Sequence, residues 1–446
     1  MARGWFDGVL RGRIDGLYLL LLGSALFLSV GFFGEFISST SMQDFKSVYY
    51  GARCLLQHGD PYNESQLLHV YLSEGGEQNP RQAGQRAAVA SFINLPTTTV
   101  FAIPFAMLPW GPAHALWMIL TAGSFMLACY LMWELDADRT PLLSGFLICF
   151  LLASSASLLM TGNAAGIVIG LCVIAVWCFL KDRFALAGVI CLAISLAIKP
   201  HDAGLVWLYF LLAGGVYRKR ALQALGAAVA LGLPAILWVW HGSPFWIQEL
   251  HTHLVALSAR GNLNDPGPAA GCIHDAGGVI NLQSVISIFR DDPRIYNPVT
   301  YLICFSLLLI WSAATLRSRF SPARTKLALA AIAPLTMLVT YHRPYDAKLL
   351  LLAVPACAVL CAQRSLAGWL ALAATITGIV ATGDYSLIAL ANLAGNPQWN
   401  AAGVFGKTLT VALTRPVPLI LLAACIFPLW VYVRHCFAES HEQAES

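Results

Sequence analysis

The sequence predicts an all-α polytopic membrane protein, and three observations support this fold class. Hydrophobic residues make up 58% of the 446 residues and charged residues only 11%, whereas ordinary soluble proteins carry about 25% charged residues. The mean hydropathy is +0.67. Apolar stretches of roughly 17 to 25 residues, the length that a helix needs to cross a bilayer, recur along the whole chain. Alternating segments of the kind that spanning strands need do not dominate, so we expect helices to form the spans.

Twelve apolar segments are expected to cross the membrane. The first follows a basic amino terminus, but at about 20 residues it is too long for the apolar core of a typical signal peptide, so we expect it to be retained. The expected spans are 17–36, 112–134, 142–160, 164–180, 184–198, 203–217, 221–241, 298–316, 326–341, 347–363, 365–382 and 410–433.

Basic residues between these segments predict how the chain is oriented. Lysine and arginine collect in short cytoplasmic connections of membrane proteins, and clusters such as Arg218-Lys219-Arg220 all fall on one side of the predicted topology. Both termini are then cytoplasmic, and the other side receives two long outer loops, 37–111 and 242–297, and a shorter one, 383–409. A span at 95–108 would move most later clusters outside, so we expect an interfacial or re-entrant helix there.

The chain is expected to form a single domain, 1–438, followed by a disordered cytoplasmic tail, 439–446. The net charge of +4 reflects topology, and no nucleic-acid partner is expected. Ten of the twelve cysteines lie in apolar spans or at their ends. Cys54 and Cys272 lie in the outer loops, where a disulfide is possible if that side is oxidising.

Asp44, eight residues beyond the first apolar run, is the most informative residue of the chain. A carboxylate held beside a membrane needs a reason to be there, and the predicted topology brings other polar residues to the same face. Each of these alone could be a helix cap, a surface ion pair or a snorkelling side chain. Because they all fall on the outer face of the predicted topology, together they predict a functional site there. Its expected members are Asp44, Lys46, Arg53, Asn163, Lys199, His201, His274, Asn281, His342, Arg343 and Tyr345.

This set suits sugar transfer from a lipid phosphate. Lysine and arginine can hold a phosphate leaving group, and histidine can donate a hydrogen bond to it. One carboxylate, Asp44, can accept the proton of an attacking hydroxyl. A single base without a carboxylate nucleophile indicates inversion at the anomeric carbon.

Six motifs resemble those of a known family. They are Asp44 to Tyr62, Asn94 to Pro109, Gly162-Asn163, Lys199-Pro200, Asn281 to Ser284 and Tyr341 to Asp346. Their order and residues resemble the GT-C superfamily of membrane glycosyltransferases, and within it glycosyltransferase family 87. This is the polyprenol-phosphate-mannose-dependent mannosyltransferase-like family, which includes phosphatidylinositol-mannoside mannosyltransferases.

The resemblance implies a GT-C-type bundle of about 12 transmembrane helices, with short interfacial helices in the two long outer loops. It implies that Asp44 is the catalytic base and that Lys199, His342 and Arg343 lie near the donor phosphate or the acceptor. Two departures from the family's pattern stand out: Asn163 replaces a usual glutamine, and Asn281-Leu-Gln283-Ser284 is a loosened Asn-Gln-Ser.

The leading hypothesis is an inverting hexosyltransferase of the cytoplasmic (inner) membrane, with its active site on the outer, periplasmic face. It would move a hexose, expected to be mannose, from a polyprenyl-phosphate sugar to a lipid-linked or glycan hydroxyl. No cofactor is expected, and a divalent metal is possible but not favoured. The alternative is a polytopic transporter or lipid flippase, which usually places ionisable residues near the bilayer midplane. A structural membrane subunit would leave the one-sided cluster unexplained.

Overall fold

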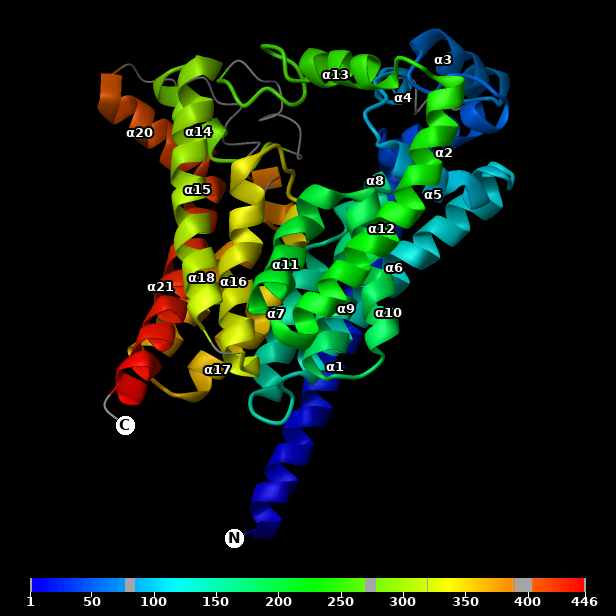
Figure 1. Ribbon diagram of the computed structural model, residues 1–446. Coiled ribbons are helices and arrows are strands. Elements are labelled where there is room, and N and C mark those ends of the chain that lie inside the picture. Colours follow the sequence, from blue (N-terminus) through cyan, green and yellow to red (C-terminus); the bar gives the residue numbers. More distant parts are fainter. Residues whose placement is uncertain are drawn as a thin grey trace.

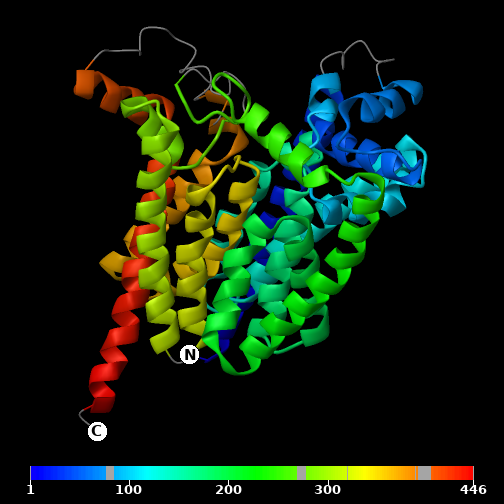
Figure 2. The same ribbon diagram turned by 45° about the horizontal axis from the view of Figure 1, so that its top comes forward.

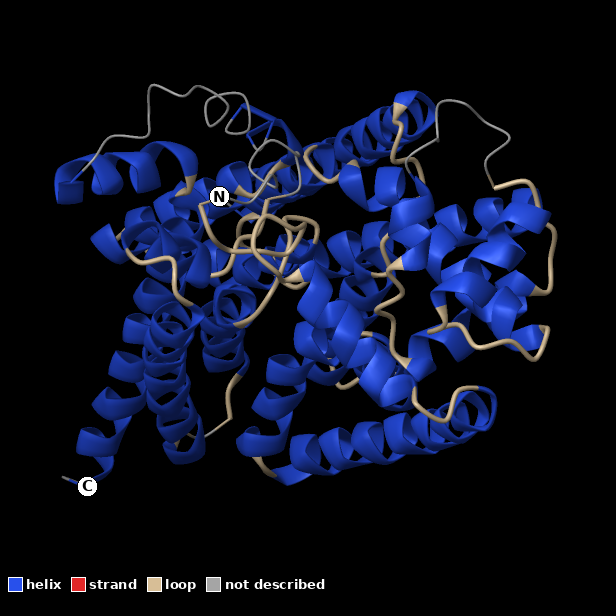
Figure 3. Cartoon of the chain, turned by 90° about the horizontal axis from the view of Figure 1, so that it is seen from above, coloured by secondary structure: helices blue, strands red, loops and turns tan. Residues whose placement is uncertain are grey.

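The computed structural model describes residues 2–76, 85–268, 278–318, 320–386, 388–389 and 403–444, without the side chains of 2–11 and 437–444. All the regular elements in these ranges are helices (Figure 3). Long helices run side by side in a bundle, and shorter ones cover the end of the bundle that lies away from both termini (Figures 1 and 2).

The bundle contains most of the apolar sequence. Its helices are α1 (Ala2–Ile37), α6 (Trp110–Glu134), α7 (Pro141–Ala153), α8 (Ser157–Thr161), α9 (Ala165–Leu180), α10 (Ala185–Ile198), α11 (Pro200–Ala213), α12 (Gly215–Gly242), α15 (Pro293–Arg317), α16 (Pro322–Val339), the 3₁₀ helix η3 (Asp346–Ala353), α17 (Val354–Ala362), α18 (Leu366–Ala381) and α21 (Pro416–Ala444). The shorter helices at the far end are α2 (Gln43–Leu56), α3 (Glu64–Ser73), α4 (Gln85–Ala90), α5 (Pro96–Ala106), α13 (Trp246–Leu257), α14 (Gln283–Phe289) and α20 (Gly403–Thr414).

The helices confirm that this is a helical membrane protein. Fewer of them than the twelve predicted spans meet the length and hydropathy needed to cross a bilayer. Seven helical segments among the described residues are long and apolar enough to cross a bilayer. The helices α9, α10 and α18 are apolar but shorter, so the count of twelve stays a prediction. The seven segments are Gly12–Ile37, Trp110–Glu134, Pro141–Thr161, Gly215–Gly242, Pro293–Arg317, Pro322–Val339 and Pro416–Cys436.

Local breaks divide several of the predicted spans, among them 142–160, 203–217, which breaks at Gly214 between α11 and α12, and 410–433. The segment 142–160 is interrupted between α7 and α8, where Ser154 and Ser155 bond back to carbonyl oxygens of the preceding turn, as serine often does in place of helix bonds. The segment 410–433 divides into α20 and α21 at Pro416, which lacks the amide hydrogen that would continue the first helix. Helix α21 then extends to Ala444, through most of the tail that the sequence predicts to be disordered.

The segment 95–108 forms α5, whose 11 residues are fewer than the roughly 20 that a helix needs to cross a bilayer. Pro96 occupies its first turn, which suits a residue without an amide hydrogen. The hydroxyls of Thr97 and Thr98 donate to the carbonyls of Ala197 and Ile198 at the end of α10. Helix α5 therefore fixes the backbone that leads directly into Lys199.

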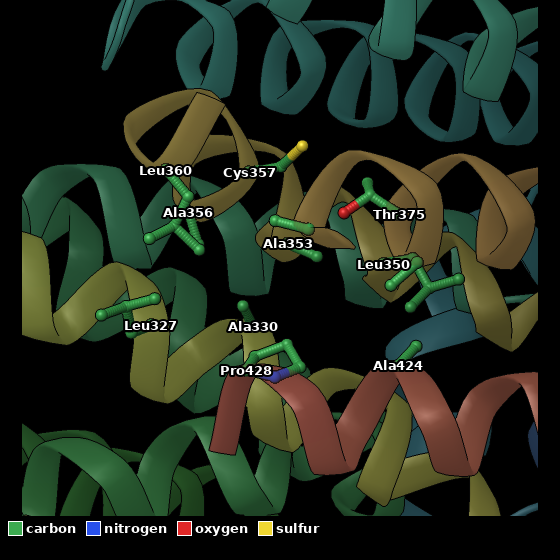
Figure 4. Close-up of a pocket in the computed structure, with 12 residues that line it drawn as sticks. Leu327, Ala330, Leu350, Ala353, Ala356, Cys357, Leu360, Thr375, Ala424 and Pro428 are labelled. Carbon is green, nitrogen blue, oxygen red and sulfur yellow. The ribbon is translucent and has the colours of Figure 1, made fainter. Parts of the chain in front are cut away.

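One pocket lies deep in the bundle, among α16, η3, α17, α18 and α21 (Figure 4). Apolar side chains such as Leu327, Leu350 and Leu360 line it. Its lining includes no member of the predicted site, so the candidate chemistry lies elsewhere.

Candidate active site

Helix α2 carries Asp44 in its first turn, and packing on both sides holds that turn in place. Phe45, which is fully buried, stacks on Trp117 with ring centroids 4.4 Å apart. The amide of Met42 donates to the carbonyl of Met160 in α8 over 2.8 Å. The Tyr49 hydroxyl donates to the Leu108 carbonyl over 2.8 Å. The position of Asp44 is therefore set by contacts of α2 and the residue before it with Leu108, Trp117 and Met160.

The turn between α8 and α9 brings an amide to Asp44. Gly162 has φ +66°, a conformation that glycine adopts without penalty, and a Cβ there would lie 2.8 Å from the Cβ of Phe45. Trp117 Nε1 donates to the Gly162 carbonyl over 2.8 Å. In the next residue, Asn163 Nδ2 donates to Asp44 Oδ2 over 2.8 Å. The Gly-Asn pair of the sequence is thus a support for the predicted base.

Lys199 lies at the junction of α10 and α11, between two acidic residues. Its Nζ is 2.6 Å from Asp346 Oδ1 and 3.1 Å from Asp202 Oδ2. The same Nζ donates to Asn163 Oδ1 over 3.5 Å and lies over the ring of Tyr345, 5.4 Å from its centroid. Lys199 is therefore connected to Asp44 through a single side chain, that of Asn163.

The segment between α16 and η3 supplies the third part of the site. Asp346 Oδ2 accepts from the backbone amide of Arg343 over 2.9 Å. The Arg343 guanidinium donates to the Tyr341 hydroxyl and the Leu263 carbonyl. His342 is 1% exposed, and its Nε2 lies 3.3 Å from Asp202 Oδ1.

Electrostatics suit Asp44 to the role of a base. Burial raises the pKa of Asp44 above its ordinary value, while the hydrogen bond from Asn163 and the positive charges of Arg343 and Lys199 oppose this rise. A carboxylate whose pKa is raised takes up a proton more readily than an exposed one. The site can therefore accept a proton at Asp44 and hold an anion with the nearby cations.

Two predicted members, Lys46 and Arg53, lie away from this cluster. An α-helix turns by about 100° per residue, so both point to the side of α2 opposite Asp44. Lys46 donates to Gln85 Oε1 over 2.5 Å, and burial lowers its pKa to about 8. Arg53 pairs with Glu74 over 2.6 Å. The structure shows both holding α2 to its neighbours.

Asn281 lies close to the site but supports it from outside. Its Oδ1 accepts from the amide of Ser284 over 3.2 Å at the start of α14. The amide of Ile280 donates to the carbonyl of His342 over 3.0 Å, and Gln283 Nε2 donates to the carbonyl of Val339 over 2.9 Å. This motif therefore braces the backbone that carries His342. His274 and Cys272 lie outside the described residues, so their predicted roles stay predictions.

Three residues with metal-binding side chains meet at one corner of the cluster. Ligand atoms of His201, Asp202 and His342 lie within 4.8 Å of one another. The rings of His201 and His342 meet edge to face, with centroids 5.1 Å apart.

Asp202 and Asp346 pair with Lys199, although neither is among the site residues that the sequence predicts. The spacing of three between Lys199 and Asp202 at the start of a helix was the available signal. No sequence signal links Lys199 to Asp346, 147 residues away.

Comparison with known proteins adds one match. The model of glycosyltransferase family 87 matches residues 92–339, which is more than half of the chain. The range includes Asn163, Lys199 and Asp202. The segment 341–346 lies just beyond its end, and Asp44 lies well before its start. No curated protein and no solved structure matches the chain.

Proposed function

The chain belongs to glycosyltransferase family 87, and on this premise we propose that it is an inverting, lipid-phosphate-dependent hexosyltransferase. The donor is a polyprenyl-phosphate sugar, expected to carry mannose, and the acceptor is a hydroxyl of a lipid or glycan. The observation that supports this most is the chain of contacts from Asp44 through Asn163 to Lys199. In this proposal Asp44 is the base and Lys199 is the cation connected to it, at one end of a hydrophobic helix bundle that a lipid-borne donor can reach.

In this reaction Asp44 accepts the proton of the acceptor hydroxyl while the hydroxyl oxygen attacks the anomeric carbon. The bond between that carbon and the phosphate oxygen breaks, and the lipid phosphate leaves with the bonding electrons. Lys199 and Arg343 offset the negative charge that develops on the leaving phosphate. Because attack and departure occur on opposite faces of the sugar, the anomeric configuration inverts.

The arrangement of the chain agrees with an outward-facing site. The cluster lies at the end of the bundle opposite both termini (Figure 1), and the basic residues of the short connections indicate cytoplasmic termini. We therefore propose that transfer takes place at the outer face of the cytoplasmic membrane. There a donor phosphate can rest at the interface while its polyprenyl chain stays in lipid.

Transfer from labelled donors to membrane lipids in proteoliposomes tests this function. We expect sugar to move from a polyprenyl-phosphate mannose and not from a nucleotide sugar, and the product linkage to have the configuration opposite to that of the donor. Nuclear magnetic resonance of the product distinguishes the two configurations. Use of the nucleotide sugar would contradict the proposed donor, and retention would contradict the single-base mechanism. Movement of the lipid across the bilayer without transfer would favour a flippase.

Asn163→Ala is expected to move the acidic limb of the pH profile for kcat/KM to higher pH. The Asn163 hydrogen bond lowers the pKa of Asp44, so its loss lets that pKa rise further. A larger fraction of Asp44 is then protonated, and inactive as a base, at any pH below the plateau. Asn163→Gln keeps an amide and is the matched control, with a smaller shift expected. An unchanged acidic limb in Asn163→Ala would show that Asn163 does not tune the base.

A further inference from the structure

We propose that His201, Asp202 and His342 form a binding site for one divalent transition-metal ion of the Zn²⁺ class. Neither the proposed transfer chemistry nor the sequence requires such an ion. The site does not consist of a pair of acidic residues next to Asp44. Its ligands are two histidines and one carboxylate. They come from the first turn of α11 and from the segment before η3, which only the folded chain brings together.

One pair of ligand atoms has the spacing that a single ion requires, and the third ligand atom lies somewhat farther away. His342 Nε2 lies 3.3 Å from Asp202 Oδ1, and His201 Nε2 lies 3.8 Å from the same oxygen. Zinc binds histidine nitrogen and carboxylate oxygen at about 2.0–2.2 Å, so ligand atoms around one ion lie roughly 3–3.5 Å apart. The His201 side chain is 44% exposed, which leaves its ring room to close the remaining gap.

The orientation of the His342 ring points to a ligand. Its Nδ1 lies 3.2 Å from the Thr340 carbonyl, a partner that accepts a hydrogen bond from an N–H. Metal-binding histidines commonly hold a carbonyl or carboxylate in this way, which leaves the other nitrogen free for the ion. Nε2 is buried and faces Asp202 Oδ1 at 3.3 Å, a spacing that either a proton on the ring or a bound cation can account for. Two lone pairs in contact repel each other unless a cation lies between them.

Asp202 has one carboxylate oxygen that can bind the ion. Its Oδ2 faces Lys199 Nζ at 3.1 Å, which leaves Oδ1 for the two histidines. The carboxylate would thus join the ion to Lys199, and through Lys199 and Asn163 to the surroundings of Asp44. Imidazole ligands favour zinc and similar ions over magnesium and calcium, which prefer oxygen. Three protein ligands leave coordination positions open for water or for an oxygen of a phosphate.

Metal binding by the purified protein tests the site without any sugar substrate. The full chain is purified in detergent with an affinity tag that lacks histidine, stripped with a chelator and titrated with ZnCl₂. We expect the parent protein to bind one Zn²⁺ per chain. His342→Ala and His201→Ala should each lower the affinity by more than about 100-fold, because changes outside the ligand shell alone cost about 10- to 100-fold. His251→Gln removes an exposed histidine of α13 and is the matched control, with unchanged binding.

Co²⁺ provides a second readout, since its visible absorption reports nitrogen ligands directly. A spectrum that appears in the parent chain and in His251→Gln, but not in His201→Ala, would support the site. His201 is partly exposed, so we expect this variant to fold, as its melting temperature will show. Binding that is equal in the parent and in both alanine variants would place the ion elsewhere and overturn the proposal. An absence of binding would also overturn the proposal. It would indicate that His342 is protonated and forms an ion pair with Asp202.

Discussion

Asp44→Asn is expected to lower the rate of sugar transfer by about 10²–10⁴-fold, the usual contribution of a general base. The substitution keeps the size of the side chain and an oxygen that can accept the hydrogen bond from Asn163. It removes the capacity to take up a proton from the acceptor. We therefore expect the loss in kcat rather than in donor binding, measured with purified protein in proteoliposomes and a labelled polyprenyl-phosphate sugar.

Asp60→Asn is the matched control for this prediction. Asp60 lies in the same predicted outer loop, and its Oδ1 accepts from the amide of Tyr62 over 2.9 Å, a contact that an asparagine oxygen can also make. We expect Asp60→Asn to keep most of the transfer activity and Asp44→Asn to keep the melting temperature of the parent. Full activity of Asp44→Asn would contradict the assignment of the base. A large loss of stability in that variant would instead indicate a structural carboxylate.

The sequence predicted the helices well because the length of an apolar run governs whether a helix can lie in lipid. Breaks inside these runs depend on single residues. Hydropathy averaged over a long stretch of sequence does not reveal them. Ser154, Ser155 and Pro416 each interrupt a segment that reads as continuous by hydropathy. The short helix α5 was expected from its length and from the charge pattern, both of which the sequence contains.

The site was predictable in part. Asp44 stands out as an isolated acid, and Lys199 ends an apolar run just before a proline. Lys46 and Arg53 were included because they are near Asp44 in sequence, although the phase of a helix directs them to its other side. The contact between Lys199 and Asp346 depends on how α10 and η3 both pack against α9, and that packing is a property of the whole bundle.

Lys199→Met is expected to destabilise the protein as well as to abolish most transfer. Lys199 faces Asp202 and Asp346, which are 2% and 3% exposed, and its removal leaves two buried carboxylates without their shared cation. Loss of one partner from a buried ion pair typically costs about 3–5 kcal/mol. We expect a clear fall in melting temperature or in the free energy of unfolding, together with a loss of transfer if Lys199 offsets the charge of the leaving phosphate as proposed.

A second substitution separates these two effects. The double variant Lys199→Met/Asp346→Asn removes one of the stranded charges, so it should recover much of the lost stability while transfer stays low. Lys181→Met is the matched control: Lys181 pairs with Glu134 over 3.0 Å at a partly exposed site, where such pairs contribute about 0–1 kcal/mol. Parent-like stability of Lys199→Met would contradict the buried ion network. Recovery of transfer in the double variant would show that Lys199 serves the fold alone, and that the phosphate is held by other cations.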